Sequence, residues 1–234
     1  MLIKHDAAIH APSADFEFSK LSHQVLLECV QPGDKTHWGP VHDFSYSSCI
    51  TMCVRVENVF RSAHLAPIFS PPEYMEDLTT VITAFLRDKD ARVLRVSMQF
   101  LAFEHNTREL VVNSIGRFLL AKAREGLFQK LPVVVALDEA HQFLNKNIGD
   151  DANKVYLDAF GLIAKEGRKY GLTCVLATQR PRDIPEDVLS QVGMFIVHRL
   201  INERDQAVVI NASGILDGSA AAFLPNLSVC PGRI

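Results

Sequence analysis

The nine residues Val133–His141, with the sequence VVVALDEAH, decide the fold. Five uninterrupted apolar residues, rich in valine, predict a strand that is covered on both faces, as strands of parallel sheets are. Two carboxylates, Asp138 and Glu139, follow this strand directly. In an open parallel sheet, ligands bind beyond the carboxyl ends of the strands. The motif therefore predicts a parallel sheet and a polar site at its carboxyl edge.

The two adjacent carboxylates suit different tasks in nucleotide hydrolysis. Magnesium keeps several of its waters and takes few protein ligands, so Asp138 can hold the ion through its water shell. Glu139, turned to the other side, can polarise the water that attacks the γ-phosphate. The alternative is that the acids cap a helix after the strand, which is the usual role of an isolated Asp-Glu pair. The apolar strand before the pair favours the hydrolytic role, that of a Walker B motif.

A second motif starts at Glu166, where EGRKYG closes a predicted helix and leads into a buried strand over 172–177. Gly171 is well placed to end the helix in a left-handed conformation. Thr178 and Gln179 follow the strand. A polar pair at this position, beside the strand that carries Asp138 and Glu139, can reach the γ-phosphate or the attacking water, which is a sensor role. The alternative is a polar strand end that satisfies backbone groups.

Arg168 lies in the last turn of the helix before this strand. A cation is favoured there by the helix dipole, so one interpretation is simple end-capping. The other is an arginine that a subunit supplies to its neighbour's nucleotide, where it stabilises transition-state charge. The pattern of residues leaves both interpretations open.

Two regions of the chain differ in their pattern of apolar and polar residues. Residues 1–72 are irregular, with one predicted helix over 48–62, whereas apolar and amphipathic stretches alternate over 73–234. Besides the two strands above, this second region contains predicted strands over 91–100 and 194–200 and predicted helices over 73–87, 104–125, 155–170, 185–191 and 203–212. Alternating strands and helices with short links predict an α/β fold, a parallel sheet with helices on both faces, preceded by a mainly helical segment.

The composition is that of an ordinary globular protein, with 48% hydrophobic and 22% charged residues. A net charge of -3 gives no basic footprint, so DNA binding would need a local patch or a ring-shaped assembly. No apolar run approaches the ~18 residues of a membrane span, and the first residues lack the apolar core of a signal peptide. Five cysteines without paired spacing fit a reducing cytoplasm.

Four motifs in order, VVVALDEAH, KEGRKYGL, VLATQRP and FIVHRLINERDQAVV, resemble the HerA helicase/translocase branch of the HerA/FtsK superfamily. The resemblance covers residues 91 to 234, and the ordered set is far more specific than any single motif. It implies a RecA-like core, part of a P-loop NTPase, in a homo-hexameric ring that uses ATP and Mg²⁺ to move double-stranded DNA through its channel. It also implies an effector partner, such as a NurA-type nuclease in DNA repair or an antiphage effector in antiviral defence.

The resemblance also implies roles for single residues. Asp138 and Glu139 match the Walker B pair, with Asp138 on Mg²⁺ through water, and Gln179 matches the sensor. Arg168 resembles the trans-acting arginine. Arg199 is similar to a further site or interface arginine, its alternative being a salt-bridged residue at a strand end. The matching stretch that contains Arg199 also includes Asn202 and Asp205.

The chain departs from the family at the phosphate-binding loop. The sequence contains no G-x-x-x-x-G-K-[ST] motif, whose glycines let consecutive backbone N–H groups curl round the β-phosphate. The nearest string, Pro32–Thr36, lacks the upstream glycine and the glycine beside the lysine. We therefore expect a piece of a longer protein, in which residues 1–72 form a helical insert that follows the missing loop.

Three functions are compatible with these residues. The first is an ATPase and DNA helicase as the complete protein, with the phosphate-binding loop outside this chain and the chain alone inactive. The second is a catalytically inactive, truncated ring or scaffold subunit that supports an effector and contributes Arg168 in trans. The third is a nuclease or other metal enzyme that uses Asp138, Glu139 and His141. It is the weakest of the three, because no further ligand cluster in the sequence supports a metal cage.

Overall fold

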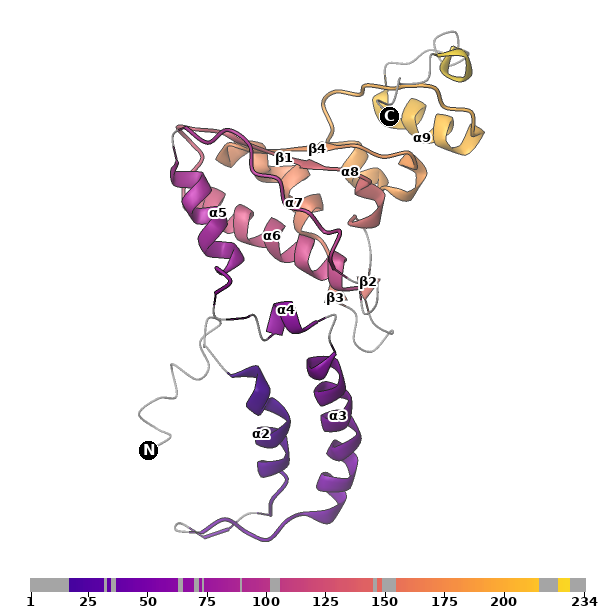
Figure 1. Ribbon diagram of the computed structural model, residues 1–234. Helices are drawn as coiled ribbons and strands as arrows, with labels where there is room; N and C mark the ends of the chain where they lie inside the picture. Colours follow the sequence, from indigo (N-terminus) through magenta and orange to yellow (C-terminus); the bar gives the residue numbers. More distant parts are fainter. Residues whose placement is uncertain are drawn as a thin grey trace. The chain divides into compact units, whose positions relative to one another are not determined.

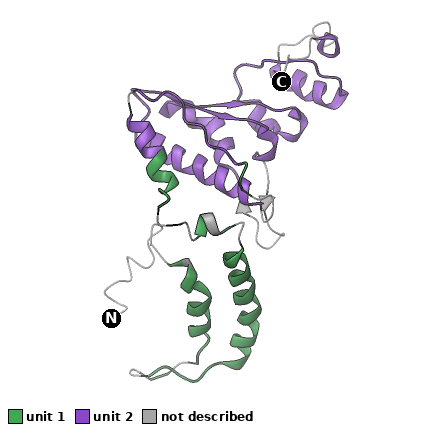
Figure 2. Cartoon of the chain, viewed as in Figure 1, with its two compact units in different colours: residues 1–81, 99–102 green, residues 82–98, 103–234 purple. Residues whose placement is uncertain are grey.

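The structure is a computed structural model with two compact units (Figure 2). Unit 1 comprises residues 1–81 and 99–102, and unit 2 comprises residues 82–98 and 103–234. The structure describes the following residues: 17–31, 33–34, 37–62, 65–69, 72, 74–88, 90–101, 106–144, 147–148, 155–214 and 223–227. The first sixteen residues of the predicted N-terminal region, and Lys35 and Thr36 of the string discussed above, lie outside them.

Unit 1 is built on two helices, α2 (Leu21–Leu27) and α3 (Asp43–Arg61), with a short helix α4 (Ala66–Phe69) (Figure 1). The predicted helix over 48–62 is α3, which starts five residues earlier. His42 explains the earlier start, because its side chain caps the helix by accepting the Ser45 N–H at 3.2 Å. The helices α2 and α3 pack together, and Ser22 donates a hydrogen bond to Glu57 across them.

Unit 2 contains a two-stranded parallel sheet, β1 (Val133–Leu137) and β4 (Leu172–Leu176), paired in register from Val133–Leu172 to Leu137–Leu176. The connection between the strands passes through α7 (Ala159–Glu166), which packs on β4 and on α6 (Thr107–Arg124). Two further strands, β2 (Asn147–Ile148) and β3 (Val155–Tyr156), form a separate antiparallel pair. The parallel pair with its helical crossover confirms the prediction of an α/β chain.

The core of unit 2 lies on one face of the parallel pair, where the helices are (Figure 1). Alternate residues of each strand point to it, and Leu137 and Leu172 are buried there. On the opposite face, the side chains of Val134 and Val175 are 62% and 52% exposed. The prediction of helices on both faces is therefore wrong within the described part of the chain. An apolar strand reads the same in sequence whether one or both of its faces are covered.

The predicted strands over 91–100 and 194–200 are also wrong. Both segments have an extended course without assigned strand structure, and Val93 and Ile196 are 85% and 81% exposed. A strand exists only through backbone hydrogen bonds to a neighbour, and β1 and β4 form their ladder with each other. Apolar residues in alternation show that a segment can enter a sheet, but they do not supply the partner.

The helix predicted over 155–170 starts later than expected, because Val155 and Tyr156 belong to β3. Asn113 of α6 fixes the true start, since its side-chain oxygen accepts the Ala159 N–H at 3.1 Å. The α-helix then tightens into a 3-10 turn, Gly167–Tyr170, and ends at Gly171 with φ +76°. The left-handed cap predicted at Gly171 is therefore confirmed.

The remaining helices of unit 2 are α5 (Leu78–Arg87), which begins in unit 1, α8 (Glu186–Leu189) and α9 (Glu203–Ser213), with short 3-10 turns over Pro181–Asp183 and Leu224–Asn226. These helices lie within the predicted ranges, except for one residue at the end of α9, but α5 starts five residues later than predicted and α8 is shorter than predicted. Asn202 caps α9 by accepting the N–H groups of Arg204 and Asp205. None of the helices that the structure describes has both the length and the apolar composition of a membrane span.

Candidate active site

The parallel pairing of β1 and β4 brings the two sequence motifs to one edge. Leu137 and Leu176 are partners in register, so residues 138–141 and 177–180 leave the sheet side by side. Beyond the ladder, the Ala177 N–H donates to the Leu137 carbonyl at 2.9 Å, and the Ala140 N–H donates to the Ala177 carbonyl at 2.8 Å. The polar residues that follow the strands are therefore held on backbone that is itself hydrogen-bonded.

Glu139 and Gln179 meet at this edge. The Gln179 side-chain amide donates to Glu139 Oε1 at 3.1 Å, and each residue comes from a different motif. Asp138 lies beside them with an exposed carboxylate, whose Oδ1 accepts the backbone N–H of Glu139 at 3.0 Å. The two carboxylates are thus separated in role: Glu139 contacts the neighbouring strand end, and Asp138 is open to ligands from solvent.

His141 joins this group, although the sequence alone favours a structural role for it. Its Nδ1 lies 3.1 Å from Thr178 Oγ1, and Thr178 Oγ1 also accepts the Arg180 N–H at 3.0 Å. The same Nδ1 lies 3.3 Å from Glu139 Oε2, with the imidazole side chain only 15% exposed. The structure therefore places His141 between Glu139 and Thr178. The spacing of His141 two residues after Glu139 was the only signal for this contact in the sequence.

One oxygen of this group has no hydrogen bond. Glu139 Oε2 is buried and accepts no hydrogen bond from the described residues, although His141 Nδ1 lies 3.3 Å away. A buried carboxylate oxygen without a donor costs free energy, about 1–3 kcal/mol for a typical buried polar group. The oxygen without a hydrogen bond is the one beside His141, whereas the oxygen that Gln179 contacts is Oε1.

The backbone of Glu139 is strained. Its φ and ψ are +48° and +47°, in the left-handed region that side chains other than glycine and asparagine seldom adopt. This conformation costs on the order of 1–2 kcal/mol. It turns the chain sharply after β1, so that the Glu139 side chain faces Gln179 while Ala140 is buried. Strained residues of this kind cluster at sites where a side chain must be aimed.

The residues at this edge fit a hydrated magnesium ion but not a metal cage. In the part of the chain that the structure describes, no three His, Cys, Asp or Glu side chains are grouped to hold a metal. Asp138 provides one exposed carboxylate, which suits an ion that keeps most of its waters. The chain's sequence provides no glycine-rich loop to hold phosphates.

Arg168 is not brought to this edge. It is exposed in the 3-10 turn that precedes β4, so the full strand of five residues separates it from Gln179. At about 3.3 Å per residue, this strand is roughly 16 Å long, so Arg168 is not placed to contact Glu139 of its own chain. Arg199 is exposed in the segment before α9. This segment is not a strand, so the alternative of a strand-end residue does not hold for Arg199.

The chain is similar to known proteins over this same region. Residues 122–215 match the family model described as Helicase HerA-like C-terminal. The DNA double-strand break repair helicase HerA of Pyrococcus furiosus is 40% identical over 82 residues, which are 35% of this chain and 14% of that protein. The HerA protein of Sulfurisphaera tokodaii is 30% identical over 117 residues, which are 48% of this chain and 23% of the relative.

A longer but weaker match is the HerA protein of Saccharolobus solfataricus, 28% identical over 167 residues, which are 67% of this chain and 32% of the relative. The aligned region therefore spans a third or less of the length of these three relatives. The matched residues of the family model, 122–215, include both strands of the parallel pair and all of the polar residues at their carboxyl edge.

Proposed function

Because the chain is a HerA-type helicase family member, we propose that it is the hydrolytic part of an ATP-dependent double-stranded DNA translocase. In this proposal its parallel pair belongs to a RecA-like core, and the phosphate-binding loop is supplied outside the chain. The observation that carries the proposal is the hydrogen bond from Gln179 to Glu139, which joins the ends of two parallel strands. This juxtaposition unites a base for water with a residue that can respond to the nucleotide.

Each residue of the edge has a distinct task in this function. Glu139 accepts a proton from the attacking water, as a carboxylate within reach of that water can. Gln179 orients Glu139 through Oε1 and senses the γ-phosphate, with Thr178 beside it. Asp138 would hold a hydrated Mg²⁺, and this ion would supply charge neutralisation at the phosphates of ATP. His141 keeps Glu139 and Thr178 in place from behind.

We propose that the complete protein works as a homo-hexameric ring around DNA. The position of Arg168 supports this, because it is exposed at the edge of the sheet opposite Glu139. An arginine that cannot reach the site of its own chain can serve the nucleotide of a neighbouring subunit. Arg199 is proposed as a second site or interface arginine. An effector protein, such as a nuclease or an antiphage effector, would act with the ring.

A second candidate is a catalytically inactive ring or scaffold subunit that supports an effector. One observation favours it: none of the 234 residues forms the G-x-x-x-x-G-K-[ST] motif. Such a subunit would offer Arg168 to its neighbours without turning over nucleotide itself. The two candidates differ in a single property, which is hydrolysis at the subunit's own Glu139.

The test uses the complete protein and the change Glu139→Gln, which keeps the shape of the side chain but removes the base. We expect ATP binding to stay within about two-fold, while DNA-stimulated hydrolysis falls by roughly 10²–10⁴-fold. Glu186→Gln is the matched control, an exposed glutamate on α8, and should hydrolyse normally. Normal turnover in Glu139→Gln would refute the hydrolytic assignment. ATP binding without turnover in the unmodified protein would support the inactive subunit.

A further inference from the structure

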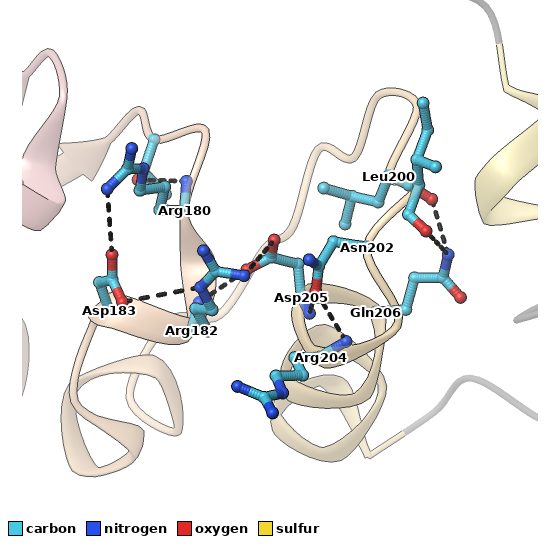
Figure 3. Close-up of polar contacts among 10 residues, drawn as sticks. Arg180, Arg182, Asp183, Leu200, Asn202, Arg204, Asp205 and Gln206 are labelled. Atoms are coloured by element: carbon cyan, nitrogen blue, oxygen red, sulfur yellow. Dashed lines mark hydrogen bonds and ion pairs between the residues drawn. The ribbon is translucent and has the colours of Figure 1, made fainter.

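The first turn of α9 contacts two other segments of the chain (Figure 3). One is the loop that follows β4, and the other is the segment that carries Arg199. Gln206 donates to the carbonyl oxygens of Leu200 and Ile201, at 2.8 and 3.3 Å. It therefore fixes the segment that carries Arg199. On the other side of the same turn, Asp205 contacts Arg182 in the loop that follows β4. This loop begins at Ala177 and includes Gln179.

Asp205 is an unusual residue in this position because its carboxylate is buried, with the side chain 8% exposed. Its Oδ1 accepts the Arg182 backbone N–H at 3.3 Å, and its Oδ2 lies 3.7 Å from Arg182 Nη1. A buried carboxylate is costly unless it is paired, so these contacts are held firmly. An acid at the third position of a helix often turns back to the capping residue. Asp205 instead reaches across to another loop.

The loop that Asp205 holds is short and stiff. Only Arg180 and the buried Pro181 separate Gln179 from Arg182. The turn Pro181–Asp183 is closed by the Asp183 N–H on the Arg180 carbonyl at 3.1 Å. Because so few residues lie between them, a displacement of Arg182 is expected to displace Gln179 as well. A carboxylate of α9 thus holds the loop three residues after Gln179.

We propose that Asp205 is a positioning residue for Gln179 and that the first turn of α9 couples Gln179 to the Arg199 segment. This proposal rests on the hydrolytic function proposed above. A change at the nucleotide that moves Gln179 is passed through Arg182 and Asp205 to α9, and through Gln206 to Leu200 and the adjacent Arg199. Movement of the Arg199 segment by a neighbouring subunit would reach Gln179 by the same route.

The first experiment measures amide hydrogen exchange in the complete protein, which does not depend on any activity. Asp205→Asn keeps the shape and an acceptor but removes the charge. We expect amides of residues 179–184 and 199–202 to exchange faster, by about ten-fold, since local opening becomes easier. The matched control is Asp183→Asn, which removes an exposed carboxylate that also lies near Arg182, 3.8 Å from its Nε. It should exchange as the unmodified protein does.

Arg182→Gln provides a second route to the same loss, since the Arg182 side chain is about a third exposed and can be replaced without opening the core. We expect it to reproduce the exchange pattern of Asp205→Asn. If the two changes break one link, the double variant should exchange no faster than either single variant. Unchanged exchange over 179–184 in both single variants would overturn the proposal, as would equal effects of Asp183→Asn and Asp205→Asn.

The second experiment measures ATP hydrolysis in the same variants. Misplacing Gln179 without removing it should lower kcat by about ten-fold or more, with KM within about two-fold. A link that only supports folding would lower the melting temperature and leave kcat per folded molecule unchanged, which would also overturn the proposal. If Glu139→Gln still hydrolyses ATP, the proposed function fails. The exchange pattern then decides separately whether Asp205 holds the Gln179 loop.

Discussion

The two edges of the β1–β4 pair each contain a residue in the left-handed conformation, but they meet this demand differently. At the amino edge the residue is Gly171, with φ +76°, and a Cβ there would lie 2.2 Å from the Phe128 carbonyl oxygen. At the carboxyl edge it is Glu139, with φ +48°. Glycine relieves the strain at the first edge, whereas the second edge keeps it.

The difference shows which edge is built for packing and which for chemistry. At Gly171 the chain passes so close to Phe128 that only glycine fits, so this position serves packing. At Glu139 the side chain is required, since Gln179 hydrogen-bonds to it and His141 lies beside it. The strain of the backbone is the cost of aiming that carboxylate. Changes at the two edges should therefore affect different properties.

The largest effect expected concerns Arg168, which could make the amino edge a functional edge as well. If Arg168 acts on a neighbouring subunit's nucleotide, Arg168→Ala in the complete protein should lower hydrolysis by on the order of 10³-fold or more. A helix cap would cost only about 0.5–2 kcal/mol of stability and leave most turnover. Lys169→Ala is the control, because Lys169 is the adjacent exposed cation of the same turn.

Mixing subunits separates a trans role from a defect inside one chain. Arg168→Ala subunits combined with Glu139→Gln subunits should recover part of the ATPase activity, because some neighbours then pair an intact arginine with an intact glutamate. Near-normal hydrolysis by Arg168→Ala alone would return this residue to the role of a cap and shift attention to Arg199.

Gly171→Ala should have the second largest effect, on stability rather than on chemistry. The new Cβ must displace the Phe128 backbone, and the alanine must adopt a left-handed backbone conformation. We therefore expect the free energy of unfolding to fall by about 2–4 kcal/mol. Denaturant unfolding measures this change. Gly193→Ala is the matched control, since nothing lies within 4 Å of a Cβ there. Equal stability of the two variants would show that the amino edge is not tightly packed.

Glu139→Gly should have the smallest effect on stability, and its sign is informative. Glycine relieves the left-handed strain but loses more entropy on folding, so the variant should be as stable as the original or more stable by about 0.5–1 kcal/mol. ATP hydrolysis should be lost. Glu186→Gly, in the ordinary backbone of α8, should instead lose about 0.5–1 kcal/mol. A marked destabilisation by Glu139→Gly would mean that the glutamate is kept for folding.

Several parts of the fold were predictable from the sequence because they depend on local chemistry. A valine-rich apolar run predicted β1 and a second, mostly apolar run predicted β4, and Gly171 predicted the end of the turn before β4. The approach of Glu139 to Gln179 followed from these, since parallel strands must end at the same edge. The roles proposed for these residues in ATP hydrolysis stay predictions.

The other parts depend on contacts that a single sequence does not display. The segments over 91–100 and 194–200 have the composition of strands, but neither is a strand in the described part of the chain. The start of α7 depends on Asn113, more than forty residues earlier. In the sequence, His141 stands out only as a residue of the metal-enzyme alternative and Asp205 only as part of the stretch that resembles the family. The fold shows that His141 contacts Glu139 and that Asp205 contacts Arg182.

The most direct test of the central claim is a double-mutant cycle on Glu139 and Gln179, measured as the rate of ATP hydrolysis by the complete protein. If the two residues act together on one water, Glu139→Gln and Gln179→Ala should each be severely impaired, and the double variant should be no slower than the slower single variant. Losses that multiply in the double variant would contradict the account, because the hydrogen bond from Gln179 to Glu139 would then have no part in hydrolysis.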